Sequence, residues 1–439
     1  MTGDFTKPMT DVDPSRARVC SSTARANSPR LLARRRRYKL CRDVAGIVAL
    51  GASGCRIIGR KVLQLRSQAT SLWAGAILQN NSGRKVAPDR EDEMHFTTPA
   101  IRASRATAVV LAVVLACACA PAQAQQKTYL MKISTPTVHD VPNVWLDGYA
   151  AMLEKDSGGR IKPQIYPASQ LGAIPRQIEG AQFGSIQCVQ IPPEFMVGLD
   201  SRFQVLAAPG LVDSDAQGQR LASDPAVRKL MLGLGANKGL HGVSVWYATP
   251  NVLISRTPLR NLADFKGKKI RVFASPFQTV AFERLGMTPV ALTLGDVLPA
   301  LQTGTIDGAI TGIGPIVKFR MFDAAKYVTQ INQPAIFLIE EVNEKWYESL
   351  PKDLQQIVDA DATKEDAAIA SVTAKMANEY LGEWKSAGGT LIELSSAEHA
   401  EMMKTLTSVG ADVSSKDPML AAAYKLVTEA AERAAGTKN

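Results

Sequence analysis

The sequence predicts an α/β protein built of two lobes of similar size. From residue 125 onward, the strand-like segments YLMKIST, IKPQIYP and SIQCVQI alternate with helical stretches at 141–155 and around 174–182. A second alternating set begins near His241 with GVSVWYATPNVLISRT and KKIRVFA, and continues through PFQTVAFERLG, TPVAL, LGDVLPALQTG and IDGAITG. Parallel strands need crossover connections, so this order favours a parallel or mixed sheet with helices on both faces.

The part of the chain before residue 125 differs from this body in charge. The 439 residues have a net charge of +10, but residues 1–124 alone hold 20 Lys or Arg and 8 Asp or Glu. The remainder is nearly neutral, at −2. The basic tract at 34–37 is typical of a solvated arm rather than of a nucleic-acid contact. We therefore expect no nucleic-acid partner.

Residues 94–124 have the layout of a secretory signal peptide. Arg102 and Arg105 form a short basic region, and the apolar run at 106–120 is too short to span a bilayer. Ala122, Gln123 and Ala124 then form a small-x-small cleavage pattern. The sequence therefore predicts a periplasmic mature protein.

Two further expectations concern the start of the chain. We expect translation to begin at Met94, which makes residues 1–93 a spurious, disordered extension. The stretch VLAC at 114–117 is also similar to a lipoprotein cleavage site, so a lipid anchor at Cys117 stays open as an alternative.

The cysteines divide at the same place as the charge. Five of them lie before residue 125, and Cys188 stands alone after it. The body can form no internal disulfide, and Cys188 is expected to be a small buried apolar residue. The cysteine spacing and the three body histidines match no metal-site pattern, so we expect no metal and no cofactor.

Towards the C-terminus the chain is strongly helical. The stretch 352–385 has few helix breakers and predicts one unusually long helix. Upstream, Gly286 and Gly304 each follow a run of helical periodicity and fit the left-handed residue that ends many helices.

The sequence shows no apparatus for catalysis. It has no GxSxG, HExxH or GxxxxGK[ST] motif, and the cluster GLGANKG at 233–239 lacks GxGxxG spacing. Asp359, Asp361, Glu365 and Asp366 have the spacing of a solvated helix face. We therefore expect a protein that is not an enzyme and that binds its ligand in a cleft between the lobes.

Three stretches carry a family resemblance: GRIKPQIYPASQLG at 159–172, LADFKGKKIRV at 262–272 and DVLPALQTGTIDG at 296–308. In order and spacing they resemble the DctP-type solute-binding subunits of tripartite ATP-independent periplasmic (TRAP) transporters, and the resemblance covers essentially the whole body. It implies a two-lobed fold like that of type II periplasmic binding proteins, with a long helix bracing both lobes. It also implies capture of an organic acid and its delivery to membrane permease subunits.

The lobe boundaries follow from the same resemblance. We expect lobe I to comprise 125–248 plus about 337–376, and lobe II to comprise 249–336 plus about 377–439. Contact with the membrane is then expected only through the permease, or through the lipid anchor considered above.

Arg271 is the strongest candidate for a ligand contact. It lies in KKIRVFA, a run that otherwise alternates as a strand. In the family that the chain resembles, the arginine of this word pairs with the ligand carboxylate. A guanidinium suits that role because two parallel N–H donors match a carboxylate. Phe273 lies two residues on, on the same face, and is expected to wall the pocket.

Other contacts are expected from the first lobe. The loop after the first strand suggests Thr135 and His139, with a helix cap as the alternative for His139. Gln170 in PASQLG is a candidate contact, with fixing the loop under the cleft as its alternative. The end of SIQCVQI and the stretch that follows it suggest Gln190 and Glu194, with a solvent-facing position as the alternative for Glu194.

Two departures from the family pattern bear on the ligand. Thr311 stands where many members have a ligand-contacting asparagine, and Asn251 stands where some have a second arginine. The remote end of the ligand would then meet hydroxyls, amides and rings such as that of Tyr247. The sequence thus predicts a monocarboxylate with an apolar, hydroxylated or aromatic tail rather than a C4-dicarboxylate. An organic-acid sensor subunit and an enzyme acting on a small acid are the alternatives.

Overall fold

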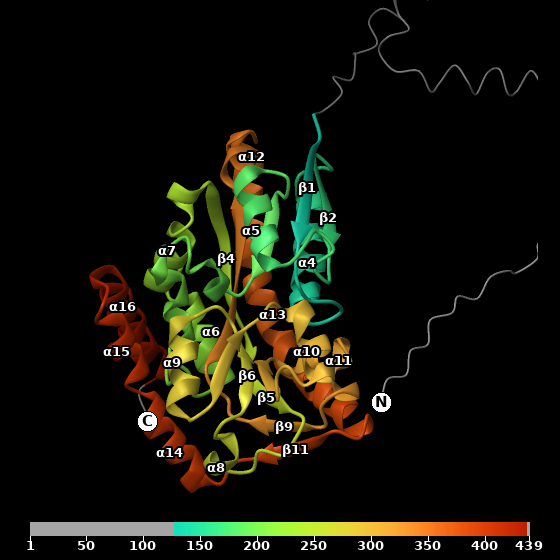
Figure 1. Ribbon diagram of the computed structural model, residues 1–439. Helices are drawn as coiled ribbons and strands as arrows, with labels where there is room; N and C mark the ends of the chain where they lie inside the picture. Colours follow the sequence, from blue (N-terminus) through green and yellow to red (C-terminus); the bar gives the residue numbers. More distant parts are fainter. Residues whose placement is uncertain (1–126, 437–439) are drawn as a thin grey trace, which may run out of the picture. The chain divides into compact units, whose positions relative to one another are not determined.

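The computed structural model describes residues 127–436, which belong to one compact unit (Figure 1). The expected extension at 1–93, the signal peptide at 94–124 and Cys117 lie outside the described residues. Within the described part, no helix combines the length and the hydropathy needed to cross a membrane.

The first half of this unit is built on a five-stranded mixed sheet of order β2-β1-β3-β10-β4. Strand β1 pairs in parallel with β2 and β3, whereas β10 is antiparallel to β3 and β4. The strands are β1 (Tyr129–Ser134), β2 (Ile161–Tyr166), β3 (Cys188–Ile191), β4 (Leu240–Pro250) and β10 (Ala335–Asn343). The helices of this half are α4 (Val141–Asp156), α5 (Ile174–Phe183), α6 (Asp215–Ser223), α7 (Pro225–Gly233) and α12 (Glu344–Glu348), with short 3-10 helices η1 (Pro193–Met196) and η2 (Ser201–Ala207). The predicted alternation from β1 to β3 is confirmed.

The second half is built on a six-stranded mixed sheet of order β11-β9-β5-β8-β6-β7. Strand β6 pairs in parallel with β7 and β8, and β5 is antiparallel to β8 and β9. The strands are β5 (Val252–Ser255), β6 (Lys269–Val272), β7 (Thr288–Ala291), β8 (Gly308–Thr311), β9 (Tyr327–Gln330) and β11 (Thr390–Glu393). The helices are α8 (Leu262–Phe265), α9 (Pro276–Arg284), α10 (Val297–Thr303) and α11 (Ile313–Lys318). Gly286 and Gly304 have φ values of 78° and 73°, as predicted for residues that end helices.

The chain crosses between the two sheets where β4 leads to β5 and where β9 leads to β10. The sequence suggested one continuous segment at 242–257, but the structure divides it at Asn251. The Asn251 backbone N–H and its Nδ2 both donate to the Pro334 carbonyl oxygen, at 3.3 and 2.7 Å. These bonds tie the two crossing segments together, so Asn251 lies at a joint between the halves.

Helix α13 (Lys352–Ser386) confirms the predicted long helix and braces both halves (Figure 1). It packs against α4 and β4 of the first half and against α11 and β11 of the second. Trp384, near its end, is fully buried. The chain then continues through α14 (Ser396–Leu406), α15 (Val409–Ser414) and α16 (Pro418–Ala435). The sequence-based boundary grouped residues 377–439 with the second lobe, whereas α16 packs on α6, α7 and η2 of the first half.

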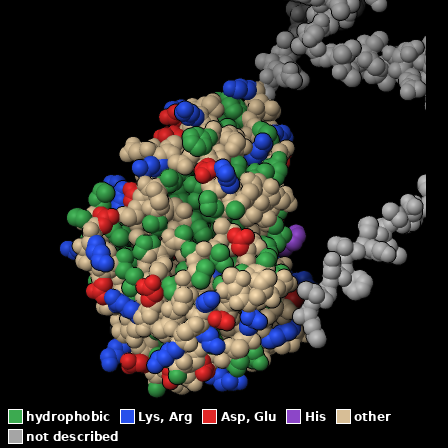
Figure 2. Space-filling view, in the orientation of Figure 1, with side chains coloured by type: hydrophobic (Ala, Val, Ile, Leu, Met, Phe, Trp, Pro, Cys, Tyr) green, Lys and Arg blue, Asp and Glu red, His purple; other side chains and the backbone are tan. Residues whose placement is uncertain are grey.

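The surface carries both signs of charge. Figure 2 shows Lys and Arg side chains interspersed with Asp and Glu on the face in view. This mixture fits the nearly neutral charge of residues 125–439. Among the described residues, no group of three or more His, Cys, Asp and Glu could hold a metal ion, and Cys188 is free and buried.

Two helical glycines allow a matched test of the packing. At Gly218 in α6, an added Cβ would lie 2.3 Å from the Tyr247 ring, whose hydroxyl is held by Asp215 at 2.7 Å. At Gly382 in α13, an added Cβ would meet nothing within 4 Å. We expect Gly218→Ala to cost about 1–3 kcal/mol of unfolding free energy through overpacking. Gly382→Ala should instead gain about 0.5–1 kcal/mol from helix propensity. Urea unfolding of both variants checks this, and a Gly218→Ala variant as stable as Gly382→Ala would contradict it.

Candidate ligand-binding site

A cavity of about 70 Å³ lies between the two halves, and both contribute to its walls. The carboxyl ends of parallel strands point at it from each sheet, which is where open α/β sheets gather their ligands. Thr135 and Gln190 come from the β1 and β3 ends, and Arg271 and Thr311 from β6 and β8. The remaining wall is mostly apolar or aromatic: Pro136, Val141, Ile174, Phe195, Phe273, Leu294, Ile313, Ile336, Leu338, Ala377 and Tyr380.

Arg271 is held rigidly in the wall of this cavity. Its side chain is buried, with the residue only 1% exposed. Nε donates to the Leu292 carbonyl oxygen and Nη1 to the Ile310 carbonyl oxygen, both at 2.9 Å. Burial lowers the pKa of Arg271 to about 9, so the guanidinium is still charged at neutral pH. Because one anchor is a backbone carbonyl of β8 and the other directly follows β7, the position of the cation is fixed before any ligand arrives.

The Arg271 cation has no carboxylate within ion-pair distance among the described residues. The acidic group with the largest influence on it is Glu194 in η1. Burial raises the pKa of Glu194 to about 8, although the charge of Arg271 opposes this rise. Glu194 is therefore mostly protonated at pH 7 and does not neutralise Arg271. A buried charge without a counter-ion is costly, so the site is suited to an anion.

Two phenylalanines form an aromatic wall beside the guanidinium. The Arg271 Cζ lies 4.5 Å from the centroid of the Phe273 ring, and Phe195 stacks on Phe273 at 5.6 Å with an interplanar angle of 28°. Guanidinium groups stack favourably on aromatic faces. This contact orients the guanidinium and keeps water away from one of its faces.

On the opposite wall, hydrogen bonds fix the orientation of the Gln190 amide. The Thr135 hydroxyl donates to Gln190 Oε1 at 3.2 Å, and Gln190 Nε2 donates to Glu340 Oε1 at 2.8 Å. Glu340 also accepts from Trp246 Nε1 at 3.0 Å. Gln190 thus faces the cavity with an orientation set by a carboxyl group buried behind it.

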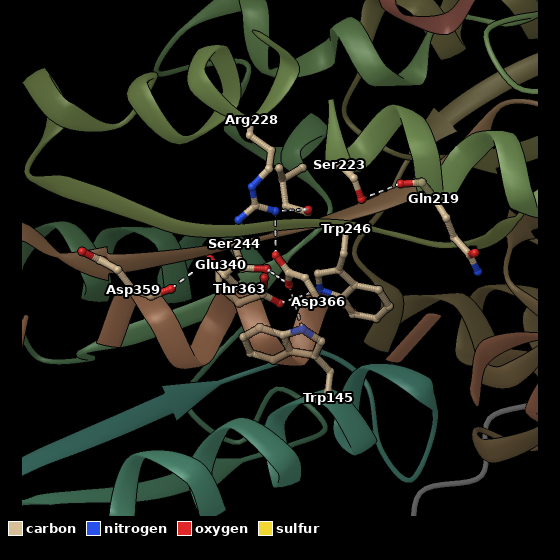
Figure 3. Close-up of polar contacts among 11 residues, drawn as sticks. Trp145, Gln219, Ser223, Arg228, Ser244, Trp246, Glu340, Asp359, Thr363 and Asp366 are labelled. Atoms are coloured by element: carbon tan, nitrogen blue, oxygen red, sulfur yellow. Dashed lines mark hydrogen bonds and ion pairs between the residues drawn. The ribbon is translucent and has the colours of Figure 1, made fainter. Parts of the chain in front are cut away.

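Behind this wall lies a buried polar network centred on Asp366 (Figure 3). Asp366 Oδ2 accepts from Arg228 Nη1 at 2.7 Å, and Oδ1 accepts from Trp145 Nε1 at 3.0 Å and from the Ser244 hydroxyl. The expectation of a solvated acidic face on this helix is therefore wrong for Asp366, whose side chain is only 10% exposed. It is also wrong for Asp361 and Glu365, which are 0% and 8% exposed. That face of α13 packs on α4 and β4, so its carboxylates are desolvated.

The buried Glu340 predicts a pH-dependent stability. Burial, with the nearby Asp366 charge, raises the pKa of Glu340 to about 8 from an ordinary value of 4.5. Below pH 4.5 both folded and unfolded chains hold the proton. Between pH 4.5 and 8 only the unfolded chain loses it, so this contribution to stability is lost as the pH rises. Glu340→Gln removes the effect and should make the protein more stable than wild type at pH 8 by about 4 kcal/mol.

Urea unfolding of wild type and Glu340→Gln across pH 4 to 8 measures this difference. The two stability curves should meet near pH 4 and diverge above it. An exposed control, Glu379→Gln on α13, should follow the wild-type curve, since its side chain is 56% exposed. Parallel curves for wild type and Glu340→Gln would contradict the assignment of a raised pKa to Glu340.

The structure brings five of the residues suggested by the sequence to the cavity wall: Arg271, Phe273, Thr311, Thr135 and Gln190. The other five do not line it. His139 and Gln170 are exposed, and Glu194 is buried behind the wall. Tyr247 donates its hydroxyl to Asp215 within the core of the first half, and Asn251 forms the joint described above.

Several lining residues were not identified from the sequence. Thr373, Ala377 and Tyr380 lie on one face of α13, at the i, i+4 and i+7 positions of a helix. The sequence shows that these three residues share one helix face. Which face of α13 borders the cavity depends on how the helix packs. Asp140 also lines the cavity, from the position just before α4. An aspartate just before a helix is an ordinary N-cap residue, so the sequence offered no reason to expect Asp140 in the cavity wall.

Comparisons with known proteins fit this geometry. Residues 143–417 match the family model DctP, described as bacterial extracellular solute-binding protein, family 7. The uncharacterized protein YiiZ of Salmonella typhimurium is 29% identical over 213 residues, or 47% of this chain and 64% of that protein, slightly under two thirds of its length. The C4-dicarboxylate-binding periplasmic protein DctP of Rhodobacter capsulatus is 27% identical over 267 residues, or 60% of this chain and 79% of that protein.

Solved structures show the same fold. A TRAP periplasmic solute-binding protein from Desulfovibrio salexigens, with bound orotic acid, superposes with a TM-score of 0.67 at 23% identity, covering 70% of this chain and 100% of that chain. The predicted two-lobed α/β fold is confirmed, and so is the resemblance seen in the three sequence stretches. Because the family model spans more than half of the residues, this chain belongs to the DctP family of bacterial extracellular solute-binding proteins, family 7.

Proposed function

We propose that this protein captures a small organic acid between its two halves in the periplasm and delivers it to the membrane permease subunits of a TRAP transporter. The observation that supports this most is the buried, charged Arg271, which has no carboxylate within ion-pair distance among the described residues. A ligand carboxylate would supply the missing counter-ion. This function requires no catalytic group.

Arg271 keeps N–H donors that a ligand carboxylate could accept from. Nε and Nη1 each donate to a backbone carbonyl, and among the described residues no hydrogen bond engages Nη2. Charge-assisted bonds from a guanidinium to a carboxylate are roughly twice as strong as neutral ones. The relatives support the same chemistry, since the Rhodobacter capsulatus protein is named for C4-dicarboxylates and the Desulfovibrio salexigens protein holds orotic acid.

Access to the site requires the halves to separate. Thr135, Gln190, Arg271 and Thr311 are each no more than 3% exposed, so a ligand from solvent cannot reach them in this arrangement. The crossing segments at Asn251 and Pro334 are the places where such a motion would bend the chain, with α13 as the third connection. Closure on the ligand then excludes water and strengthens its bonds to Arg271.

Calorimetry with matched ligands tests the carboxylate claim. Small organic acids should bind the purified protein, whereas the corresponding carboxamides should bind at least about 100-fold more weakly, because they lack the charge that pairs with Arg271. Equal affinities for an acid and its amide would contradict the proposal. Delivery to the permease is tested with vesicles that carry the permease subunits. Uptake of the same acid into these vesicles should depend on added solute-binding protein. Uptake at the full rate without this protein would contradict the proposed delivery.

A further inference from the structure

Asp140 lines the same cavity as Arg271 but comes from the other half of the molecule. It precedes α4, and the residue is 1% exposed. The Asp140 side chain is placed to cap the Asn143 backbone N–H, yet among the described residues neither carboxyl oxygen accepts a hydrogen bond of normal geometry. The contacts with Thr137 and with the Asn143 backbone lower the pKa of Asp140, but burial outweighs them and raises it to about 7. A desolvated carboxyl group that its protein neighbours satisfy only weakly thus borders the ligand space.

The charged and titratable groups around Asp140 do not satisfy it. Lys318 of α11 lowers the Asp140 pKa slightly, but its ammonium lies 3.0 Å from both carboxyl oxygens of Glu383 and over the Tyr380 ring. The Tyr380 hydroxyl of α13 faces the His139 carbonyl oxygen at 3.5 Å. Lys318 and Tyr380 are therefore engaged elsewhere, and the side of Asp140 that they leave open borders the cavity.

Among the described residues that line the cavity, only Arg271 has a guanidinium group and only Asp140 has a carboxyl group. They form no ion pair with each other within 4 Å among the described residues. One wall thus offers a fixed cation and the other an unsatisfied acceptor. The cavity measures about 70 Å³, so the ligand that bridges them is small.

We infer that the acid bound here carries, at the end remote from its carboxylate, a hydrogen-bond donor that Asp140 accepts, in the form of a hydroxyl or an ammonium group. This rests on the proposed function, because Arg271 must first hold the carboxylate. A second carboxylate at the remote end would face Asp140, and two like charges in a buried site repel strongly. The site therefore discriminates against diacids whenever Asp140 is ionised.

The predicted pH dependence has opposite signs for different ligands. With a pKa of about 7, the ionised fraction of Asp140 rises about tenfold between pH 6 and 8. An ammonium ligand pairs with the ionised form, so its affinity should rise by up to about tenfold over this range. A diacid needs the protonated form, so its affinity should fall by a similar factor. A hydroxyl can bond to either form and should change least.

Calorimetry with 4-hydroxybutanoate, 4-aminobutanoate and butanedioate at pH 6 and pH 8 tests the inference. At pH 8 the wild type should bind the hydroxy and amino acids at least about tenfold more tightly than the diacid. Asp140→Asn, which is nearly isosteric, should abolish this preference and its pH dependence. Asp147→Asn, at an exposed position of α4, is the matched control and should leave both unchanged.

Each outcome separates the two proposals. A wild type that prefers the diacid at pH 8, or an Asp140→Asn variant with unchanged preference, overturns the inference while leaving acid binding intact. A wild type that binds none of these acids and no other organic acid overturns the proposed function, and the inference falls with it. Thermal unfolding of each variant confirms that it is folded before its affinities are compared.

Discussion

Arg271→Ala is expected to reduce the affinity for the bound acid by at least about 30-fold, because removing one partner of a desolvated, hydrogen-bonded charge pair costs about 2–5 kcal/mol. The affinity of Arg271→Lys should lie between those of wild type and Arg271→Ala, since lysine keeps the charge but loses the forked donor pair that matches a carboxylate. Calorimetry against the tightest-binding acid measures both variants.

Two controls make this result specific. Arg176→Ala, at a side chain that is 78% exposed, should bind as wild type does. Arg271→Ala should itself remain folded: it strips donors from the Leu292 and Ile310 carbonyls, but it also removes a buried cation that has no counter-ion. An Arg271→Ala variant that is folded and binds the acid with unchanged affinity would refute the role of this residue.

Asp366→Ala is expected to destabilise the protein by about 3–5 kcal/mol, because it leaves the Arg228 cation largely buried without its partner. The same change also leaves Trp145 Nε1 and the Ser244 hydroxyl, which both donate to this carboxylate, without their acceptor (Figure 3). The network joins α4, α7, β4 and α13, so its loss loosens the packing of the long helix on the first half. Urea unfolding measures the effect.

The matched control lies on the same helix. Glu379 is 56% exposed and only approaches Lys375 at 3.9 Å, so Glu379→Ala should change the free energy of unfolding by less than about 0.5 kcal/mol. If Asp366→Ala lowered the free energy of unfolding as little as Glu379→Ala, the network would contribute little to stability.

Much of the fold could be predicted because local signals and tertiary packing agree. The long helix was expected at 352–385 and runs from Lys352 to Ser386, since few residues interrupt its helical propensity. Arg271 was also predictable as a buried cation beside a cavity, because a charge within an alternating apolar strand requires a partner. Its backbone anchors could not be foreseen, since they come from Leu292 and Ile310, distant in the sequence.

Other features depend on packing that the sequence does not display. Strand alternation continues through 242–257, so nothing local revealed that Asn251 turns the chain from one sheet to the other. The carboxylates of α13 have helical spacing on any face, and only contact with β4 decides that Asp366 is buried. Tyr247 was suggested as a pocket ring, but its hydroxyl reaches Asp215 on α6 instead. Aromatic residues on neighbouring strand positions point to opposite faces, and the sequence alone does not say which face meets the cavity.

The central claim is that Arg271 holds the carboxylate of an acid enclosed between the two halves. The most direct test is a crystal structure of the protein with its tightest-binding acid. The ligand should occupy the cavity between the β1, β3, β6 and β8 ends, with a carboxylate oxygen about 2.7–2.9 Å from the guanidinium of Arg271. A ligand bound elsewhere, or one whose carboxylate points away from Arg271, would contradict it.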